Sequence, residues 1–255
     1  MPDLILTRIF DEEALSVKIL RKANNSPWSL LLIACAIMAL PAILLAWSAA
    51  QGKLGVNPLD VVTRVPGYWS LFLLLAALLI APLRFACVEI ARATQRAYGK
   101  RQSDWNFLIR LRRPIGLASY FYALFHVTVY AALSIDFNWA DFQEELLTKP
   151  FIAFGVITFV MLTPLAITST NGWMKRLKRN WKHLHNSIYL AALFAVSHFY
   201  LLSKPGVTTY RIFALVLAAL FIFRAVKQWQ KSFQPQDAID GTVPERPPRP
   251  NSMLK

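Results

Sequence analysis

The sequence predicts an all-α integral membrane protein, built as a bundle of six transmembrane helices with both termini in the cytosol. Three observations carry this prediction. Hydrophobic residues make up 56% of the 255 residues and charged residues only 16%, an apolar share above the roughly 45 to 50% of soluble domains. Uncharged windows close to the roughly 20 residues that cross a bilayer occur six times. Lysines and arginines gather on alternate connections between these windows, as on the cytoplasmic loops of membrane proteins.

The windows divide the chain into three parts. The first window is too long for a signal peptide and has no small-residue cleavage site, so we expect it to remain as an anchor. We expect a cytosolic N-terminal segment over 1–26 with a short surface helix over 4–20, a six-span domain over 27–226, and a flexible cytosolic tail over 227–255. The predicted spans are Pro27 to Ala50, about Gly67 to Leu83, Pro114 to Ile135, a stretch between Lys149 and Lys175, a stretch between Lys182 and Lys204, and about Gly206 to Phe223.

Basic residues set the predicted orientation. The N-terminal segment, the second-to-third connection, the fourth-to-fifth connection and the end of the chain hold 23 of the 28 lysines and arginines. Because cytoplasmic loops carry such an excess, these regions and both termini are predicted to lie inside. We therefore assign the net charge of +14 to the membrane topology and contact with lipid, and expect no nucleic-acid partner.

Two smaller features complete this reading of the chain. Cys35 and Cys87 fall in apolar tracts, which argues against a disulfide framework or a thiolate metal site, and we expect both to pack in the core. The third-to-fourth connection is predicted to be a solvated loop on the outer side, with a docking surface as the alternative. Its acidic residues are Asp136, Asp141, Glu144 and Glu145.

Histidines inside the predicted spans are the candidate functional residues. His126 lies in the third window, and His185 and His198 lie in the fifth. Ionisable groups are costly in a bilayer and are usually retained for function, although a membrane histidine can also serve only as a hydrogen bond between helices. His183 lies among basic residues at the predicted membrane edge, so we do not expect it to be a ligand.

The spacing of these histidines indicates cofactors at two depths. His185 and His198 are thirteen residues apart, about 20 Å along a helix, so they cannot bind one metal ion. The predicted orientation places His126 and His198 together in the outer half and His185 near the cytosol. Two imidazoles on adjacent helices suit the axial positions of a haem iron. An ideal helix would leave His185 and His198 about 140° apart around its axis, which requires a distortion that the sequence does not explain.

At these residues the sequence resembles a known family. It is similar to the MsrQ proteins, formerly called YedZ, which are the haem-binding membrane subunits of the bacterial periplasmic methionine sulfoxide reductase system. These proteins belong to the ferric reductase-like transmembrane group. The resemblance covers about 52–204. The matching stretches are Leu-Gly-Val-Asn-Pro (54–58), Ile-Ala-Pro-Leu (80–83), Arg-Arg-Pro-Ile-Gly-Leu (112–117), Leu-Phe-His-Val-Thr-Val-Tyr (124–130), Ile-Thr-Ser-Thr (167–170), Trp-Lys-His-Leu-His-Asn-Ser-Ile-Tyr-Leu (181–190), and His-Phe-Tyr (198–200).

The resemblance implies a function and a set of cofactors. It implies one or two b-type haems with iron bound by His126, His185 and His198, and flavin mononucleotide (FMN) as a further cofactor. It also implies electron delivery, in the bacterial inner membrane, to a periplasmic molybdopterin-containing subunit that itself reduces methionine sulfoxide. The wider group has a second histidine fourteen residues before His126, where this chain has Arg112. Because guanidinium is a poor iron ligand, we expect Arg112 and Arg113 to neutralise haem propionates or a flavin phosphate.

The source and destination of the electrons leave alternatives open. The chain shows no Gly-rich dinucleotide fingerprint, and its tail is too short for a nicotinamide-binding domain, so we expect a separate cytosolic flavin reductase or similar donor. One alternative is a ferric reductase-like protein that passes electrons to ferric iron without a protein acceptor. The other is a non-redox transporter or scaffold whose histidines carry protons or pack between helices.

Overall fold

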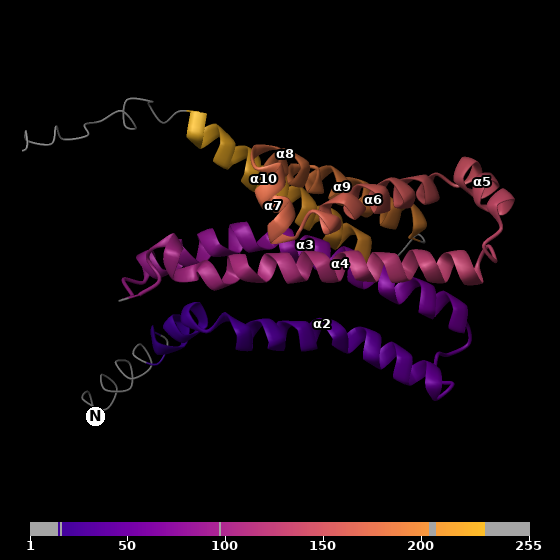
Figure 1. Ribbon diagram of the computed structural model, residues 1–255, viewed down its shortest axis with the longest axis horizontal. Coiled ribbons are helices and arrows are strands. Elements are labelled where there is room, and N and C mark those ends of the chain that lie inside the picture. Colours follow the sequence, from indigo (N-terminus) through magenta and orange to yellow (C-terminus); the bar gives the residue numbers. More distant parts are fainter. Residues whose placement is uncertain (1–14, 16, 97, 204–207, 233–255) are drawn as a thin grey trace, which may run out of the picture.

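The computed structural model describes residues 15, 17–96, 98–203 and 208–232, and this part of the chain contains helices and no strand. The helices run back and forth along the long axis of the molecule (Figure 1). The surface helix predicted over 4–20 lies mostly outside the described residues. The tail predicted over 227–255 does so from 233 onward, whereas 227–232 belong to the helix α10. In chain order the elements are α2 (Pro27–Ala50), α3 (Pro58–Ala93), η1 (Gln102–Trp105), α4 (Asn106–Leu133), α5 (Trp139–Thr148), α6 (Pro150–Ile167), α7 (Asn171–Leu177), α8 (Arg179–Asn186), α9 (Ile188–Leu202) and α10 (Thr209–Ser232).

Five helical stretches of the described chain are long and apolar enough to cross a membrane, one fewer than predicted. They belong to α2, α3, η1 with α4, α6 and α10. The predicted fifth span is divided at Ser187 into α8 and α9. Helix α9 has 15 residues, about 22 Å, which is short of the roughly 30 Å hydrocarbon core. It follows α8 directly in the chain, and at its start the Ala191 N–H donates to the Ser187 carbonyl at 2.9 Å.

Two helices extend well beyond the windows that predicted them. Helix α3 has 36 residues and begins at an Asn57 cap that accepts the Asp60 N–H. Helix α4 begins eight residues before Pro114, which lies inside the helix and not at its start. The windows were too short because they end at the first charged residue, whereas a helix continues as long as its charged side chains reach water at the bilayer edge.

The core lies between α3, α6, α9 and α10, with α4 packed along α3. Helix α3 makes its most extensive packing with α4, and α6 packs most extensively with α9. The Ser119 hydroxyl on α4 is buried and donates to the Ser70 carbonyl on α3 at 2.8 Å, joining these two helices. The buried apolar residues that form the core are Leu71, Leu74, Leu75, Leu78, Leu162, Ala191, Ala192, Val196, Phe213, Leu217 and Leu220.

Helix α2 lies at the side of the bundle, below α3 and α4 in the view of Figure 1. The Tyr122 hydroxyl of α4 lies between two backbone groups of α2 on either side of Pro41: it donates to the Met38 carbonyl at 2.7 Å and accepts the Ala42 N–H at 3.2 Å. Most of α2 is exposed, and Cys35 with it. The expectation that Cys35 packs in the core is therefore wrong, because an apolar helix facing lipid has the same composition as one facing protein. Cys87 is half-buried.

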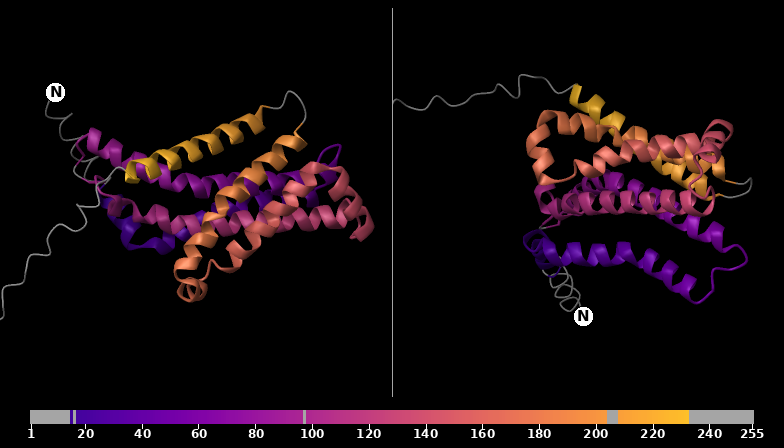
Figure 2. Two further views of the ribbon diagram at one scale, coloured as in Figure 1. Left: turned by 90° about the horizontal axis from the view of Figure 1, so that it is seen from above. Right: turned by 45° about the vertical axis from the view of Figure 1, so that its right-hand side comes forward.

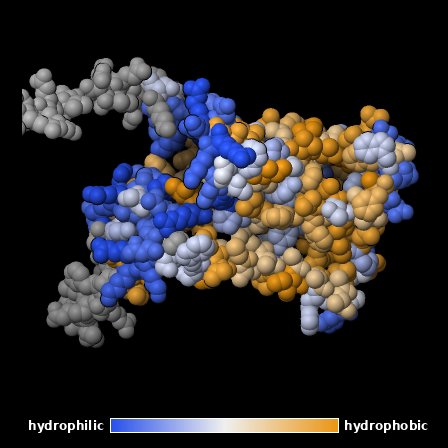
Figure 3. Space-filling view, viewed as in Figure 1, coloured by the Kyte–Doolittle hydropathy of each residue, from blue (hydrophilic) through white to orange (hydrophobic). Residues whose placement is uncertain are grey.

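The two ends of the bundle differ in polarity. Hydrophilic side chains gather where α3 ends and α4 begins, and the surface toward α5 is mainly apolar (Figure 3). We call these the basic end and the α5 end; Figure 2 shows the helices that join them. The acidic connection at the α5 end was predicted to be a loop, but it forms the helix α5. Asn138 caps this helix by accepting the Ala140 N–H. Which end faces the cytosol remains a prediction.

Candidate cofactor site

A cavity of about 780 Å³ opens between α3, α4, α6 and α9 at the α5 end. This volume is within the range of small-molecule and cofactor pockets, and such pockets are mostly apolar with a few placed polar groups. Its walls carry mainly aromatic and aliphatic side chains, together with both His126 and His198. These histidines stand on opposite helices, α4 and α9, so the cavity has a nitrogen donor on each of two sides.

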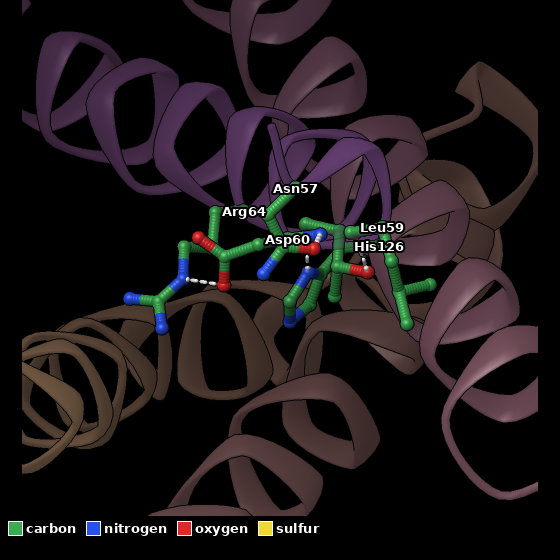
Figure 4. A network of polar contacts seen from close by, with 6 residues as sticks. Asn57, Leu59, Asp60, Arg64 and His126 are labelled. Carbon is green, nitrogen blue, oxygen red and sulfur yellow. Dashed lines mark hydrogen bonds and ion pairs between the residues drawn. The ribbon is translucent and has the colours of Figure 1, made fainter. Parts of the chain in front are cut away.

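His126 is held by a backbone carbonyl of another helix. Its Nδ1 lies 2.7 Å from the Thr63 carbonyl oxygen on α3. A carbonyl oxygen can only accept, so Nδ1 carries the proton and donates, and Nε2 keeps its lone pair. Figure 4 shows this contact, with the second ring nitrogen of His126 pointing away from α3. This is the arrangement that orients metal-binding imidazoles in proteins, where the other ring nitrogen donates to a carbonyl or carboxylate.

His198 repeats the arrangement with a third helix. Its Nδ1 lies 2.6 Å from the Phe151 carbonyl oxygen on α6, so it too donates and leaves Nε2 free to bind. The centres of the His126 and His198 rings are 6.2 Å apart, and their planes are inclined by 72°. An imidazole nitrogen binds a transition metal at about 2 Å, so two rings on one ion need roughly 6 Å between their centres. The pair fits the donor set and spacing of a bis-imidazole iron site.

A glycine lies directly against each of these rings. A Cβ atom added to Gly67 on α3 would lie 3.0 Å from His126 Nδ1. One added to Gly155 on α6 would lie 2.9 Å from His198 Nδ1. Contacts this close force neighbouring atoms to shift. The side chain of any residue other than glycine at 67 or 155 would therefore enter the space that the histidine ring occupies.

The cavity reaches polar groups at the α5 end. Arg64 and Asp60 line it and form an ion pair on the first turns of α3, seen beside His126 in Figure 4. Both side chains are about half exposed, so the pair contributes little to stability. The Tyr130 hydroxyl also lines the cavity and donates to Glu145 on α5, whose other carboxylate oxygen accepts from Lys149. The Lys149 ammonium and the Tyr130 hydroxyl lower the pKa of Glu145.

His185 lies nearer the basic end in a different setting. Its ring stacks on Trp181, with centres 3.9 Å apart, and its Nδ1 lies 3.2 Å from the Trp181 carbonyl of the same helix. The Trp181 Nε1–H donates to the Thr168 carbonyl at 3.0 Å, which joins α8 to the end of α6. Among the described residues, His185 Nε2 is a buried nitrogen that makes no hydrogen bond of ordinary geometry, with the Leu165 backbone of α6 close enough to act on the ring. Buried polar atoms of this kind are rare and call for an explanation such as a bound ligand.

The predicted arginines lie at the same end as His185. Arg112 is exposed and close enough for its charge to act on His185. Arg113 is also exposed, and its Nη1 donates to the Asn171 side chain of α7 at 2.8 Å. His183 is exposed on α8. The structure thus places His126 with His198, and His185 separately with Arg112.

The sequence analysis missed three features of these sites. Thr63 and Phe151 act through their carbonyls, and no side-chain pattern reports on a backbone atom. Gly67 and Gly155 had a signal that was not used, since a glycine inside a helical apolar tract usually has a packing or functional reason. The distortion required between His185 and His198 is the turn at Ser187, whose N–H donates to the Leu184 carbonyl at 3.0 Å.

Comparison with known proteins identifies relatives over most of the chain. Residues 66–196 match the family model of the ferric reductase like transmembrane component. A relative from Xanthomonas axonopodis pv. citri, named protein-methionine-sulfoxide reductase heme-binding subunit MsrQ, is 38% identical over 80% of this chain and 85% of its own length. Proteins of the same name from Herminiimonas arsenicoxydans (36%; 80% and 87%) and Caulobacter vibrioides (36%; 72% and 80%) are similar. The family match includes His126 and His185 and ends two residues before His198.

Proposed function

Because this chain belongs to the MsrQ family of protein-methionine-sulfoxide reductase haem-binding subunits, we propose that it is a membrane electron carrier with a b-type haem between His126 and His198. One observation carries the proposal. The two rings face the same cavity 6.2 Å apart, and each donates its Nδ1 proton to a carbonyl of a different helix. Both Nε2 atoms are then available as neutral ligands.

The bound haem supplies the one-electron chemistry, and the residues of the chain set its conditions. His126 and His198 would hold the iron, and their carbonyl partners would raise the basicity of the two imidazoles as ligands. The apolar walls exclude water and give a low dielectric, which tunes the reduction potential. Arg64 at the opening supplies a positive charge for a propionate, and Asp60 keeps its guanidinium at this position.

The inner site is proposed around His185, Arg112 and Arg113. Three properties support it: a buried Nε2 that makes no hydrogen bond of ordinary geometry, an aromatic ring stacked beside the imidazole, and two exposed cationic side chains on α4, of which Arg112 is close enough for its charge to act on His185. Guanidinium pairs with phosphate or carboxylate and hardly binds iron. We therefore propose FMN, or a second haem with one weak ligand, at this position, as the first acceptor of electrons.

The distribution of charge supports a direction for electron transfer. The basic end is proposed to face the cytosol of a bacterial inner membrane, where a flavin reductase or similar donor delivers electrons to the inner site. A haem held by His126 and His198 would supply the one-electron chemistry by which electrons reach a periplasmic molybdopterin-containing methionine sulfoxide reductase. The chain itself is the electron-transfer subunit, and the partner reduces the substrate.

The direct test measures cofactors and then transfer in the purified full chain. We expect haem and flavin to be found in the protein, and the reduced spectrum to show the α and β bands of a low-spin bis-histidine haem. In vesicles, a reduced flavin donor on one side should then be oxidised continuously only when both the methionine sulfoxide reductase and methionine sulfoxide are present on the other side. Protein without haem would contradict the proposal. Reoxidation by ferric salts alone, with no response to the reductase, would favour a ferric reductase.

A further inference from the structure

We infer that Gly67 and Gly155 are positioning residues, which set the tautomer and orientation of His126 and His198 by leaving one helix carbonyl open to each ring. The inference rests on the proposed function, because it concerns how the two histidines are prepared as ligands. It is carried by a relation that occurs twice. The carbonyl bonded to His126 belongs to Thr63, four residues before Gly67 on α3, and the carbonyl bonded to His198 belongs to Phe151, four residues before Gly155 on α6.

Helix geometry explains why a glycine is needed four residues after the carbonyl. In an α-helix the carbonyl of a residue accepts the N–H of the residue four positions later, and its second lone pair remains available. Each Cα–Cβ bond tilts toward the N-terminus, so a side chain covers the turn that precedes it. A side chain at 67 or 155 would therefore cover the carbonyl of Thr63 or Phe151. Without one, an imidazole from a neighbouring helix can reach the free lone pair.

The distances show that the histidine atom nearest to an added Cβ is also the atom that donates the hydrogen bond. At both glycines the nearest atom to an added Cβ is Nδ1 of the histidine, at 3.0 Å for Gly67 and 2.9 Å for Gly155. Each Nδ1 is also 2.7 Å or less from its carbonyl oxygen. A shift of the ring away from a new methyl group therefore lengthens and weakens this same hydrogen bond. An alanine at either position thus acts on the Nδ1 proton donor specifically, and not on a remote part of the ring.

The expected consequence is a weaker and less oriented iron ligand. Loss of the Nδ1–H donor bond lowers the basicity of the imidazole and frees the ring to rotate. A poorer donor stabilises ferric iron less, so the midpoint potential of the haem should rise. Removal of such a supporting partner typically reduces affinity for the bound metal group by roughly 10- to 100-fold. The contact at Gly155 is the tighter one, so its effect should be the larger.

The test compares Gly67→Ala and Gly155→Ala with Gly116→Ala. Gly116 is a helical glycine of α4 where an added Cβ meets no atom within 4 Å, so it controls for the general effect of glycine replacement in a membrane helix. In each full-length variant we would measure haem affinity, the electron paramagnetic resonance signature of the axial ligands, and the midpoint potential. We expect weaker binding, a shifted or high-spin signature and a raised potential at 67 and 155, and wild-type values at 116.

A second measurement keeps the inference separate from haem binding itself. In haem-free protein labelled with ¹⁵N-histidine, wild type should show Nδ1-protonated imidazoles for His126 and His198, and each alanine variant should lose this preference at one ring. Variants that fold and keep wild-type tautomers, spectra and potential would overturn the inference. Haem loss that accompanies unfolding in both variants would also overturn it, since the glycines would then serve packing alone. If wild type bound no haem, the proposed function would fail while the tautomer test remained decisive.

Discussion

His126 and His198 are held by helices other than their own, whereas His185 is held by its own helix. The outer pair depends on carbonyls of α3 and α6, so its geometry exists only after α3, α4, α6 and α9 have packed. His185 has its partner four residues earlier and a stacked tryptophan on the same turn. The outer site is therefore a property of the tertiary fold, whereas the orientation of the His185 ring is set largely within α8.

This difference bears on what each site can hold. A pair of ligands fixed by two separate helices resists rotation and suits an iron that must keep the same coordination in both oxidation states. A ligand with no opposing histidine, beside exposed arginines, suits a group bound mainly through phosphate or carboxylate. The comparison predicts that changes at the two sites have separable effects on cofactor content.

The prediction with the largest consequence concerns which membrane face each of the two sites occupies. A reporter fused after Lys255 should be active only in the cytosol, because the basic end holds most of the lysines and arginines. A matching fusion within the connection before α5 should be active only in the periplasm. Periplasmic activity of the C-terminal reporter would exchange the inner and outer sites.

Removal of individual histidines should separate the sites. We expect His126→Ala and His198→Ala each to abolish the low-spin outer haem, since an iron with one axial imidazole cannot keep that spectrum. His185→Ala should leave the outer haem in place and lower the second cofactor. His183→Ala serves as the control, because His183 is exposed. Haem and flavin content per chain would be measured, and a wild-type spectrum in both outer variants would refute the ligand assignment.

Arg112→Lys tests the chemistry of the inner site. Lysine keeps the charge and loses the planar fork that binds phosphate or carboxylate through two hydrogen bonds. We expect roughly a tenfold loss of inner-cofactor affinity, equivalent to about 1.4 kcal/mol, with an unchanged outer spectrum. Arg112→Ala should have the larger effect. Unchanged content of both cofactors, with unchanged electron transfer from the donor, would reduce the protein to a carrier with one haem.

Apolar windows and histidine spacing predicted much of this arrangement, for physical reasons. The cost of burying charge in lipid restricts both features to particular positions, so spans and the shared depth of His126 and His198 could be read from the sequence. Other features depend on contacts between distant segments. The division of the fifth span at Ser187 involves no proline or glycine, the exposure of Cys35 depends on which face of α2 is covered, and the bonds to Thr63 and Phe151 use backbone atoms.

Trp181→Phe should produce a moderate effect confined to the inner site. It keeps an aromatic ring beside His185 and removes the Nε1–H bond to the Thr168 carbonyl. Such a bond contributes about 0.5 to 1.5 kcal/mol, so the unfolding temperature should fall slightly and inner-cofactor retention should decrease. The outer haem spectrum is the internal control. A loss of outer haem in this variant would show that the two sites are not independent.

The smallest predicted effect is a change in the outer haem spectrum when the pH is lowered. The lowered pKa of Glu145 means that its contribution to stability is complete above the ordinary value of 4.5 and is lost as the pH falls through the lowered value in the folded protein. The Lys149 pair contributes about 0.3 to 0.5 kcal/mol, and the hydrogen bond from Tyr130 adds about 1 kcal/mol. Because Tyr130 and Phe142 line the cavity, acid should loosen α5 and perturb the outer haem before the inner cofactor.

Glu145→Gln would show whether this carboxylate is the group responsible. Glutamine cannot ionise, so the variant should have slightly lower stability at neutral pH and a smaller change in the outer haem spectrum when the pH falls from neutral to below the lowered pKa of Glu145. Glu144→Gln is the matched control, since Glu144 is the adjacent exposed carboxylate of α5 and its removal should leave the wild-type acid response. An acid response retained in Glu145→Gln, or equal at both cofactors, would remove the link between α5 and the outer site. The contrast between the two sites would then rest on their histidines alone.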